Sequence, residues 1–80
     1  MDTTWLSDFL ALAEHQKFSR AAEARNVTQP AFSRRIQALE NWVGTPLFDR
    51  STHTVTLTKA GEVFRRGAES PFNLVYEARP

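Results

Sequence analysis

The stretch SRAAEARNVTQPAFSRRIQALE, residues 19–40, predicts two helices separated by a tight break. Small alanines in its first half allow two helices to cross closely, and Asn26 tolerates the backbone of a sharp turn. In its second half Thr28 can cap a helix, and Pro30 falls in the first turn, where a missing amide hydrogen costs little. This is the layout of a helix-turn-helix, in which the second helix enters the major groove of DNA.

The second predicted helix, residues 29–43, has two distinct faces. Its apolar residues recur at the three- and four-residue spacing of a buried stripe, which consists of Phe32, Ile36 and Leu39. Its polar residues are left to meet a ligand: Gln29, Ser33, Arg34 and Arg35. A glutamine can make a bidentate contact with adenine, and an arginine can do so with guanine. Gly44 is a typical stop signal for such a helix.

The remaining predicted elements surround this pair of helices. A first helix, capped by Thr3 or Thr4, runs to about His15, and Ser19 caps the next helix, which ends near Arg25. The apolar and β-branched segments 47–50 and 54–57 predict a two-stranded wing. Thr58 caps a fourth helix that Pro71 should kink or end. The predicted apolar seam of this fourth helix consists of Ala60, Val63, Phe64, Ala68, Phe72 and Val75.

These elements predict a mainly α fold. We expect a winged helix-turn-helix in residues 1–58, with a three-helix core and a two-stranded β wing, followed by a linker or dimerisation helix in residues 59–80. The helix-turn-helix itself would span about residues 18–37, and the wing about residues 47–57. Eighty residues form one small domain, close to the size at which a lone core is marginal.

Composition excludes several classes of function. The chain has no cysteine, which removes disulfides, thiolate metal sites and cysteine nucleophiles, and its two histidines lie far apart. No apolar run is long enough for a signal peptide or a membrane span, so a soluble cytoplasmic protein is the default. No glycine-rich phosphate loop, nucleophile elbow or catalytic triad pattern is present. The acidic residues fall on predicted outer helical faces: Asp8, Glu14, Glu23 and Glu40. We therefore expect no enzyme, no metal and no cofactor.

The net charge of +1 hides an uneven distribution. Residues 1–16 carry three acidic side chains and no basic one, whereas residues 17–50 carry six basic and three acidic side chains. Eight of the ten basic residues are arginine, whose planar fork suits phosphate and guanine. Charge alone fits a solvated surface equally well, so it supports nucleic acid only together with the motif.

Several candidate contacts have two interpretations. Ser19 and Thr28 are helix caps that can also touch a phosphate. Arg35 either contacts DNA or pairs with neighbouring charges, and Arg50 either follows the DNA backbone or pairs with Asp49. His53, at the wing tip, either enters a minor groove or is a solvated loop residue.

The same residues resemble the amino-terminal DNA-binding domain of LysR-type transcriptional regulators. The resemblance covers about residues 5–66, and its motifs stand in this order: Phe18, Ala21-Ala22, Val27-Thr28-Gln29-Pro30, Ser33-Arg34, Ile36, Leu39-Glu40, Gly44, Leu47-Phe48-Asp49-Arg50 and Leu57-Thr58-Lys59-Ala60-Gly61. It implies a homodimer, assembled further in the full-length protein, that binds interrupted inverted repeats in promoter DNA. It also implies that an effector-binding carboxy-terminal domain, the only part to meet a small molecule or oxidant, is absent from this chain.

The resemblance implies DNA contacts at matched positions: Thr28, Gln29, Pro30, Ser33, Arg34 and Arg50. Arg25 stands where leucine is usual, which implies that its stem lies over a core position filled by other groups. Arg35 stands where glutamine is frequent. The run of residues 26–35, with Trp5-Leu6 and Asp8-Phe9-Leu10, is most similar to the hypochlorite-responsive branch of these regulators.

A second interpretation is a protein-interaction module that keeps the winged-helix fold. It would dock a partner through three aromatic side chains: Trp42, Phe64 and Phe72. Substitution of Arg34 and Gln29 separates the two interpretations, because only a DNA-binding domain would depend on them.

Overall fold

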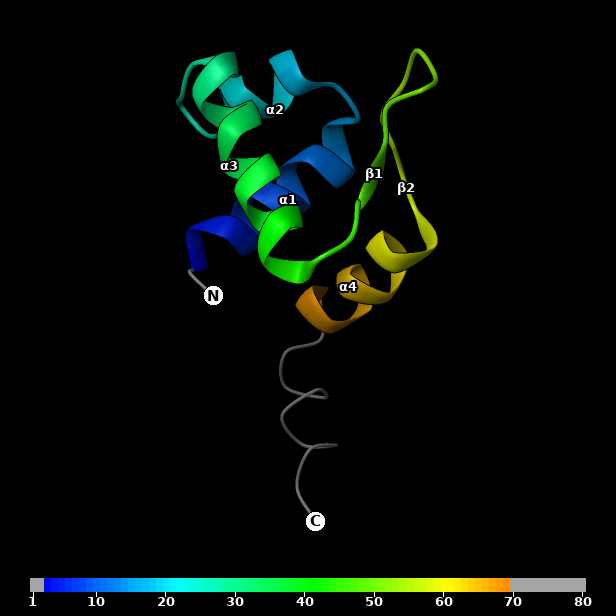
Figure 1. The fold of residues 1–80 in the computed structure, drawn as a ribbon. Helices are drawn as coiled ribbons and strands as arrows, with labels where there is room; N and C mark the ends of the chain where they lie inside the picture. The colour runs from blue at the N-terminus through cyan, green and yellow to red at the C-terminus, as the bar shows by residue number, and fades with distance from the viewer. Residues whose placement is uncertain (1–2, 70–80) are drawn as a thin grey trace.

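The computed structural model describes residues 3–69, which form four helices and one two-stranded antiparallel sheet (Figure 1). Their order is α1 (Thr3–His15), α2 (Phe18–Ala24), α3 (Gln29–Val43), β1 (Phe48–Asp49), β2 (Thr56–Leu57) and α4 (Lys59–Glu69). The predicted winged helix-turn-helix is confirmed. The predicted continuation through Pro71, Phe72 and Val75 lies outside the described residues. No helix within residues 3–69 is long and apolar enough to cross a membrane.

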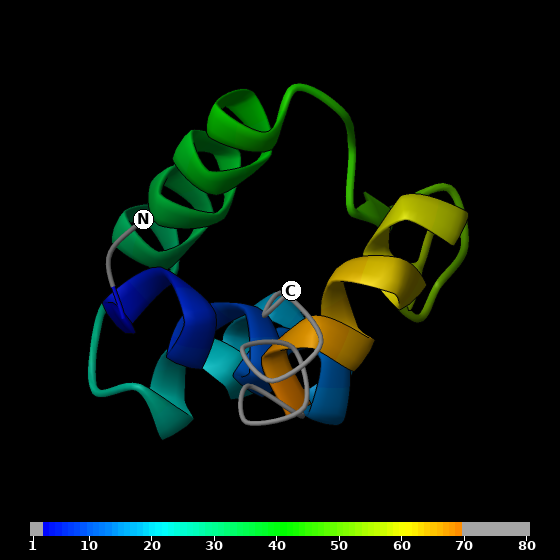
Figure 2. The same ribbon diagram turned by 90° about the horizontal axis from the view of Figure 1, so that it is seen from below.

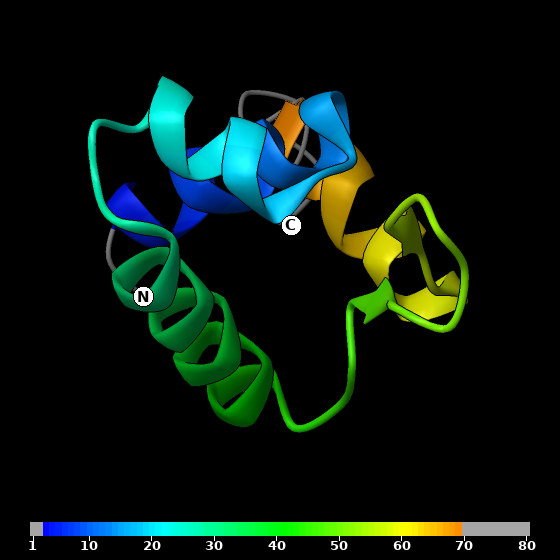
Figure 3. The same cartoon turned by 90° about the horizontal axis from the view of Figure 1, so that it is seen from above.

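One hydrophobic core joins the helices to the wing. α1 contacts each of α2, α3 and α4, while α3 and α4 lie on different sides of it (Figures 2 and 3). The buried apolar side chains come from α1, α2, α3 and the wing: Phe9, Leu12, Ala21, Ala22, Phe32, Ile36, Leu39, Leu47, Phe48 and Val55. The two alanines of α2 are almost completely buried, as a close helix crossing requires.

The limits of α3 follow from local chemistry. Thr28 Oγ1 accepts a hydrogen bond from the Ala31 backbone N–H at 3.3 Å, which confirms the predicted cap. Pro30 lies in the first turn. Gly44 ends the helix with φ 94°, in the left-handed region that glycine enters without strain. Asn26 has φ 58°, so it supplies the turn between α2 and α3.

The start of α2 differs from the prediction. Ser19 is not its cap, because the helix begins one residue earlier, at Phe18, with Lys17 in the capping position. No side-chain hydrogen bond caps this end. The backbone bends directly after α1, at Gln16, which has a left-handed φ of 61°. The capping position is therefore Lys17, two residues before the predicted Ser19.

The wing is short but anchored on both sides. Phe48 pairs with Leu57, and the backbone N–H of Val55 donates to the Gln16 carbonyl at 2.9 Å. Thr58 caps α4, as predicted, because its Oγ1 accepts from the Gly61 N–H at 3.0 Å. The same hydroxyl donates to the Pro46 carbonyl at 2.8 Å. These bonds fix the wing against α1 and α4.

The apolar seam of α4 is narrower than predicted. Ala60 and Phe64 pack against the core, and the Phe64 ring meets the Phe9 ring edge-on, with the centroids 4.8 Å apart. Val63 was expected in this seam, but it is 56% exposed, because it lies on the outer side of the helix. Phe64 is thus engaged inside the protein and is not a free docking aromatic.

Candidate nucleic-acid interface

The first turns of α3 present a polar edge. Phe32, Ile36 and Leu39 are completely buried and fix the rotation of the helix about its axis. This rotation leaves a set of side chains on the outer side of the helix, and we call this set the reading edge. It consists of Thr28, Gln29, Pro30, Ser33 and Arg34. All are exposed except Ser33, which is half-buried. The structure therefore brings these five predicted contact residues together on one accessible surface.

The wing tip and the beginning of α3 project from the same end of the molecule, the upper end in Figure 1. His53 is exposed in this tip, and Ser19 is exposed in the first turn of α2. A helix and a wing at one end can meet the same stretch of duplex, the helix in a groove and the wing along the backbone. The arrangement suits a rigid double-stranded ligand.

Arg50 has a partner that the sequence did not suggest. Its Nη2 donates to Glu40 Oε1 at 3.1 Å, and its guanidinium lies 4.9 Å from the centre of the Phe18 ring. The alternative partner, Asp49, is engaged elsewhere. Its carboxylate accepts from the Ser51 hydroxyl at 2.6 Å and from the Ser51 backbone N–H at 2.9 Å. The Ser51 hydroxyl first, and then its backbone N–H, lower the pKa of Asp49.

Arg35 is bound to a buried carboxylate of α1. Its Nη2 donates to Asp8 Oδ1 at 2.8 Å, and the same oxygen accepts from Arg25 Nε at 2.9 Å. Arg35 Nε also lies 2.8 Å from Asp8 Oδ2. That approach has the distance of an ion pair but not the direction of a hydrogen bond, so both atoms are buried without a hydrogen-bond partner. DNA contact by Arg35 stays a prediction.

Two acidic residues are buried, contrary to the prediction. Asp8 and Glu40 were expected on outer helical faces, yet they are 1% and 7% exposed. The spacing contained a signal for this, because Asp8 lies four residues before the buried Leu12 and Glu40 four residues after the buried Ile36. The guanidinium of Arg25 binds Asp8, and the expectation that its stem lies over a core position stays a prediction.

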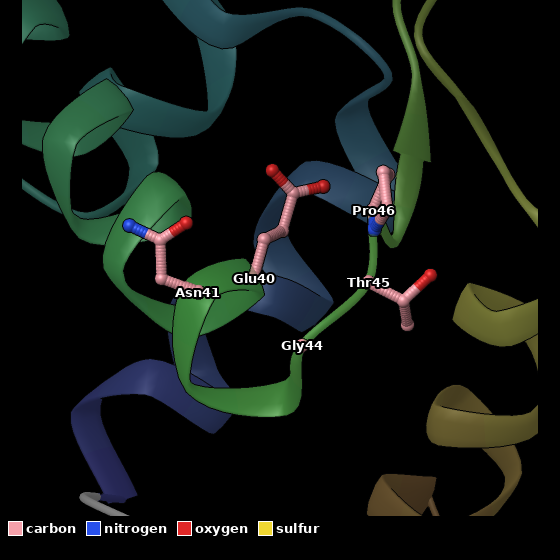
Figure 4. A pocket seen from close by; sticks show the side chains of 5 residues that line it. All are labelled: Glu40, Asn41, Gly44, Thr45 and Pro46. Carbon is pink, nitrogen blue, oxygen red and sulfur yellow. The ribbon is translucent and has the colours of Figure 1, made fainter.

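Glu40 links α3 to the wing. Figure 4 shows its carboxylate directed toward the segment that leads into β1, while Asn41 points away. Oε2 accepts from the Leu47 N–H at 2.7 Å and from the Phe48 N–H at 3.1 Å. An open hollow beside it is lined by Glu40, Asn41, Gly44, Thr45 and Pro46. Because the carboxylate is occupied by backbone donors, this hollow offers little chemistry to a ligand.

Other kinds of site have little support. Within residues 3–69, no group of three histidine or acidic side chains is placed to hold a metal ion. Trp42, one of the aromatics of the interaction-module interpretation, is 60% exposed on α3. Phe72, another of them, lies outside the described residues.

Residues 3–62 match the family described as "Bacterial regulatory helix-turn-helix protein, lysR family". The chain belongs to the LysR family. The description of the family is that of bacterial regulatory helix-turn-helix proteins.

Named LysR relatives agree in sequence and in structure. The HTH-type transcriptional regulator YjiE of Escherichia coli is 50% identical over 64 residues, which is 80% of this chain and 21% of the relative. This chain therefore spans about a fifth of that protein. DarR of Vibrio fischeri, solved in complex with DNA, is 49% identical with a TM-score of 0.86 over 96% of this chain and 26% of its own. HypT of Salmonella typhimurium, described as a hypochlorite-specific LysR-type regulator, is 43% identical with a TM-score of 0.84 over 96% of this chain and 26% of its own.

Proposed function

We propose that this chain reads promoter DNA through the first turns of α3 as part of a homodimeric transcriptional regulator. The observation that carries the proposal is the division of α3 into a completely buried apolar stripe and an accessible polar edge. A helix fixed in this way can insert into a major groove without rearranging its core. Two copies, one on each half of an interrupted inverted repeat, would lie about 34–36 Å apart.

The proposed contact residues differ in the part of the DNA that they bind. Gln29 and Arg34 contact base edges, and Ser33 contacts a base or a phosphate. The backbone N–H of Gln29, between Thr28 and Pro30, binds a phosphate. Contacts to the DNA backbone are assigned to Ser19 and Arg50, and a contact in the minor groove is assigned to His53. Arg50 can serve while it stays bound to Glu40, because its side chain is 39% exposed.

The wider assignment follows the relatives. We propose that residues 59–80 pair two protomers, that higher oligomers form in the full-length protein, and that an effector acts only through a carboxy-terminal region outside residues 1–80. We place the protein in the cytoplasm, where bacterial promoters are found. The likeness to HypT supports the finer proposal of a hypochlorite-responsive regulator.

The test is binding to an operator found by footprinting the promoter of the protein's own gene and its divergent neighbour. Arg34→Ala and Gln29→Ala should each weaken operator binding by roughly 5- to 150-fold, the effect of losing one bidentate base contact. Thermal stability should change little, because both side chains are exposed. Unchanged binding in both variants, with loss of a protein partner on Trp42→Ala, would instead favour the interaction module.

A further inference from the structure

The buried carboxylate of Asp8 joins three helical segments. It is carried by α1, and it binds Arg25 directly after α2 and Arg35 in α3. Each arginine side chain is 32% exposed, whereas the side chain of Asp8 is 1% exposed. Removal of a buried charge from such a group leaves its partners uncompensated, so the three side chains act as a unit.

Around the axis of α3, Arg35 stands nearly opposite Ser33 and about 100° from Arg34. An α-helix turns about 100° per residue, so Ser33 and Arg35 stand about 160° apart around the axis. Phe32, completely buried, lies between them on the core side. The guanidinium of Arg35 is then turned further toward α1 by its hydrogen bond to Asp8 at 2.8 Å.

We propose that Asp8 is a positioning residue, which holds the Arg35 guanidinium on the α1 side of α3 and away from DNA. The DNA contacts of α3 are then made by the reading edge alone. An arginine that is free to reach any phosphate raises affinity for all sequences alike, because phosphate contacts carry no sequence information. By binding this arginine, Asp8 limits non-specific affinity and preserves the preference for an operator. This inference rests on the DNA-binding function proposed above, and it gives Arg35 a role other than the predicted DNA contact.

The first test compares adjacent arginines of α3, using Arg34→Gln as the matched control for Arg35→Gln. Binding of each variant to the operator and to random-sequence DNA is measured over a range of salt concentrations. Arg34→Gln should weaken operator binding roughly 5- to 150-fold. Arg35→Gln should leave the salt slope and the operator preference unchanged while lowering the midpoint of urea unfolding. A fall in the salt slope of about 0.9 in Arg35→Gln, the value of one phosphate contact, would overturn the proposal.

The second test removes the negative charge that binds Arg35. Asp8→Asn should tighten binding to random-sequence DNA and steepen the salt slope by up to about 0.9, since Arg35 then reaches a phosphate. Adding Arg35→Gln to this variant should abolish the change. A purely structural Asp8 would leave the slope unchanged, and a folded Asp8→Asn chain with that result overturns the inference. If Asp8→Asn does not fold, the Arg35→Gln comparison decides alone. A wild-type chain with no operator preference would overturn the proposed function instead.

Discussion

Glu40 Oε2 accepts a hydrogen bond from the backbone N–H of Leu47 at 2.7 Å, where α3 gives way to the wing. The bond is made inside the protein, because Leu47 is completely buried and Glu40 is 7% exposed. The same carboxylate binds the Phe48 N–H and, through its other oxygen, Arg50. One side chain near the end of α3 therefore fixes the start of β1 relative to the helix that carries the reading edge.

Replacement of Glu40 by alanine should destabilise the chain by about 2–4 kcal/mol, because two buried N–H groups lose their acceptor. The free energy of unfolding in urea measures this effect. Glu40→Gln should be intermediate, since an amide oxygen still accepts but the charge that binds Arg50 is gone. Asn41→Ala, one residue further and exposed, is the control and should change stability little. An equal loss in Glu40→Ala and Asn41→Ala would contradict this role of Glu40.

Two glycines should respond differently to alanine. A Cβ at Gly61 would lie 2.1 Å from the Leu47 carbonyl oxygen, which is backbone and cannot move aside cheaply. Gly44 has open space around it, and alanine there meets only the cost of a left-handed conformation, about 1–2 kcal/mol. Gly61→Ala should therefore lower the melting temperature more than Gly44→Ala, and Gly44→Asn should be the mildest. Differential scanning calorimetry measures the order, and a smaller effect at Gly61 would argue against the close approach of α4 to the wing.

The elements with local signals were predictable from the sequence. Thr28 and Gly44 fixed the two ends of α3 through capping chemistry that depends only on neighbouring residues. The prediction that Ser19 caps α2 was wrong. A serine near a helix start is a capping candidate only where the backbone bends, and the bend comes earlier, at Gln16. Helix boundaries of this kind depend on how α1 and α2 pack, which no local pattern contains.

The reading edge was predictable for the same reason, since the apolar stripe of α3 defines it by exclusion. The partners of Asp8 and Glu40 were not predictable from the sequence. Asp8 meets Arg25 and Arg35 across 17 and 27 residues of chain, and such pairings arise only when three segments are packed together. Acidic residues are mostly exposed, so an outer face was the reasonable expectation until their arginine and backbone partners were visible.

The wing tip should show a small pH effect. The pKa of Asp49 is lower in the folded chain than its ordinary value of 3.8, because the hydroxyl and backbone N–H of Ser51 bind the ionised carboxylate. A carboxylate whose pKa is lowered by folding adds stability at a pH above its pKa in the unfolded chain. This stability is lost as the pH falls through the pKa in the folded chain. Ser51→Ala should raise the pKa of Asp49 toward 3.8 in an NMR titration. Thr52→Ala, next along the tip, is the control, and equal shifts in both variants would contradict the assignment to Ser51.

Alanine variants of the two capping threonines should differ in DNA binding but not in their effect on stability. Thr28→Ala and Thr58→Ala each remove a cap and should each cost about 0.5–2 kcal/mol of stability. Only Thr28 belongs to the reading edge, where the backbone N–H of Gln29 would hold a phosphate. At a temperature at which both variants are fully folded, Thr28→Ala should weaken operator binding, while Thr58→Ala should bind like the wild type. Fluorescence anisotropy with a labelled operator measures both affinities. Thr28→Ser, which keeps the hydroxyl, should restore most of the affinity. Equal weakening by both alanine variants would mean that Thr28 contributes through the stability of the fold and not through contact with DNA.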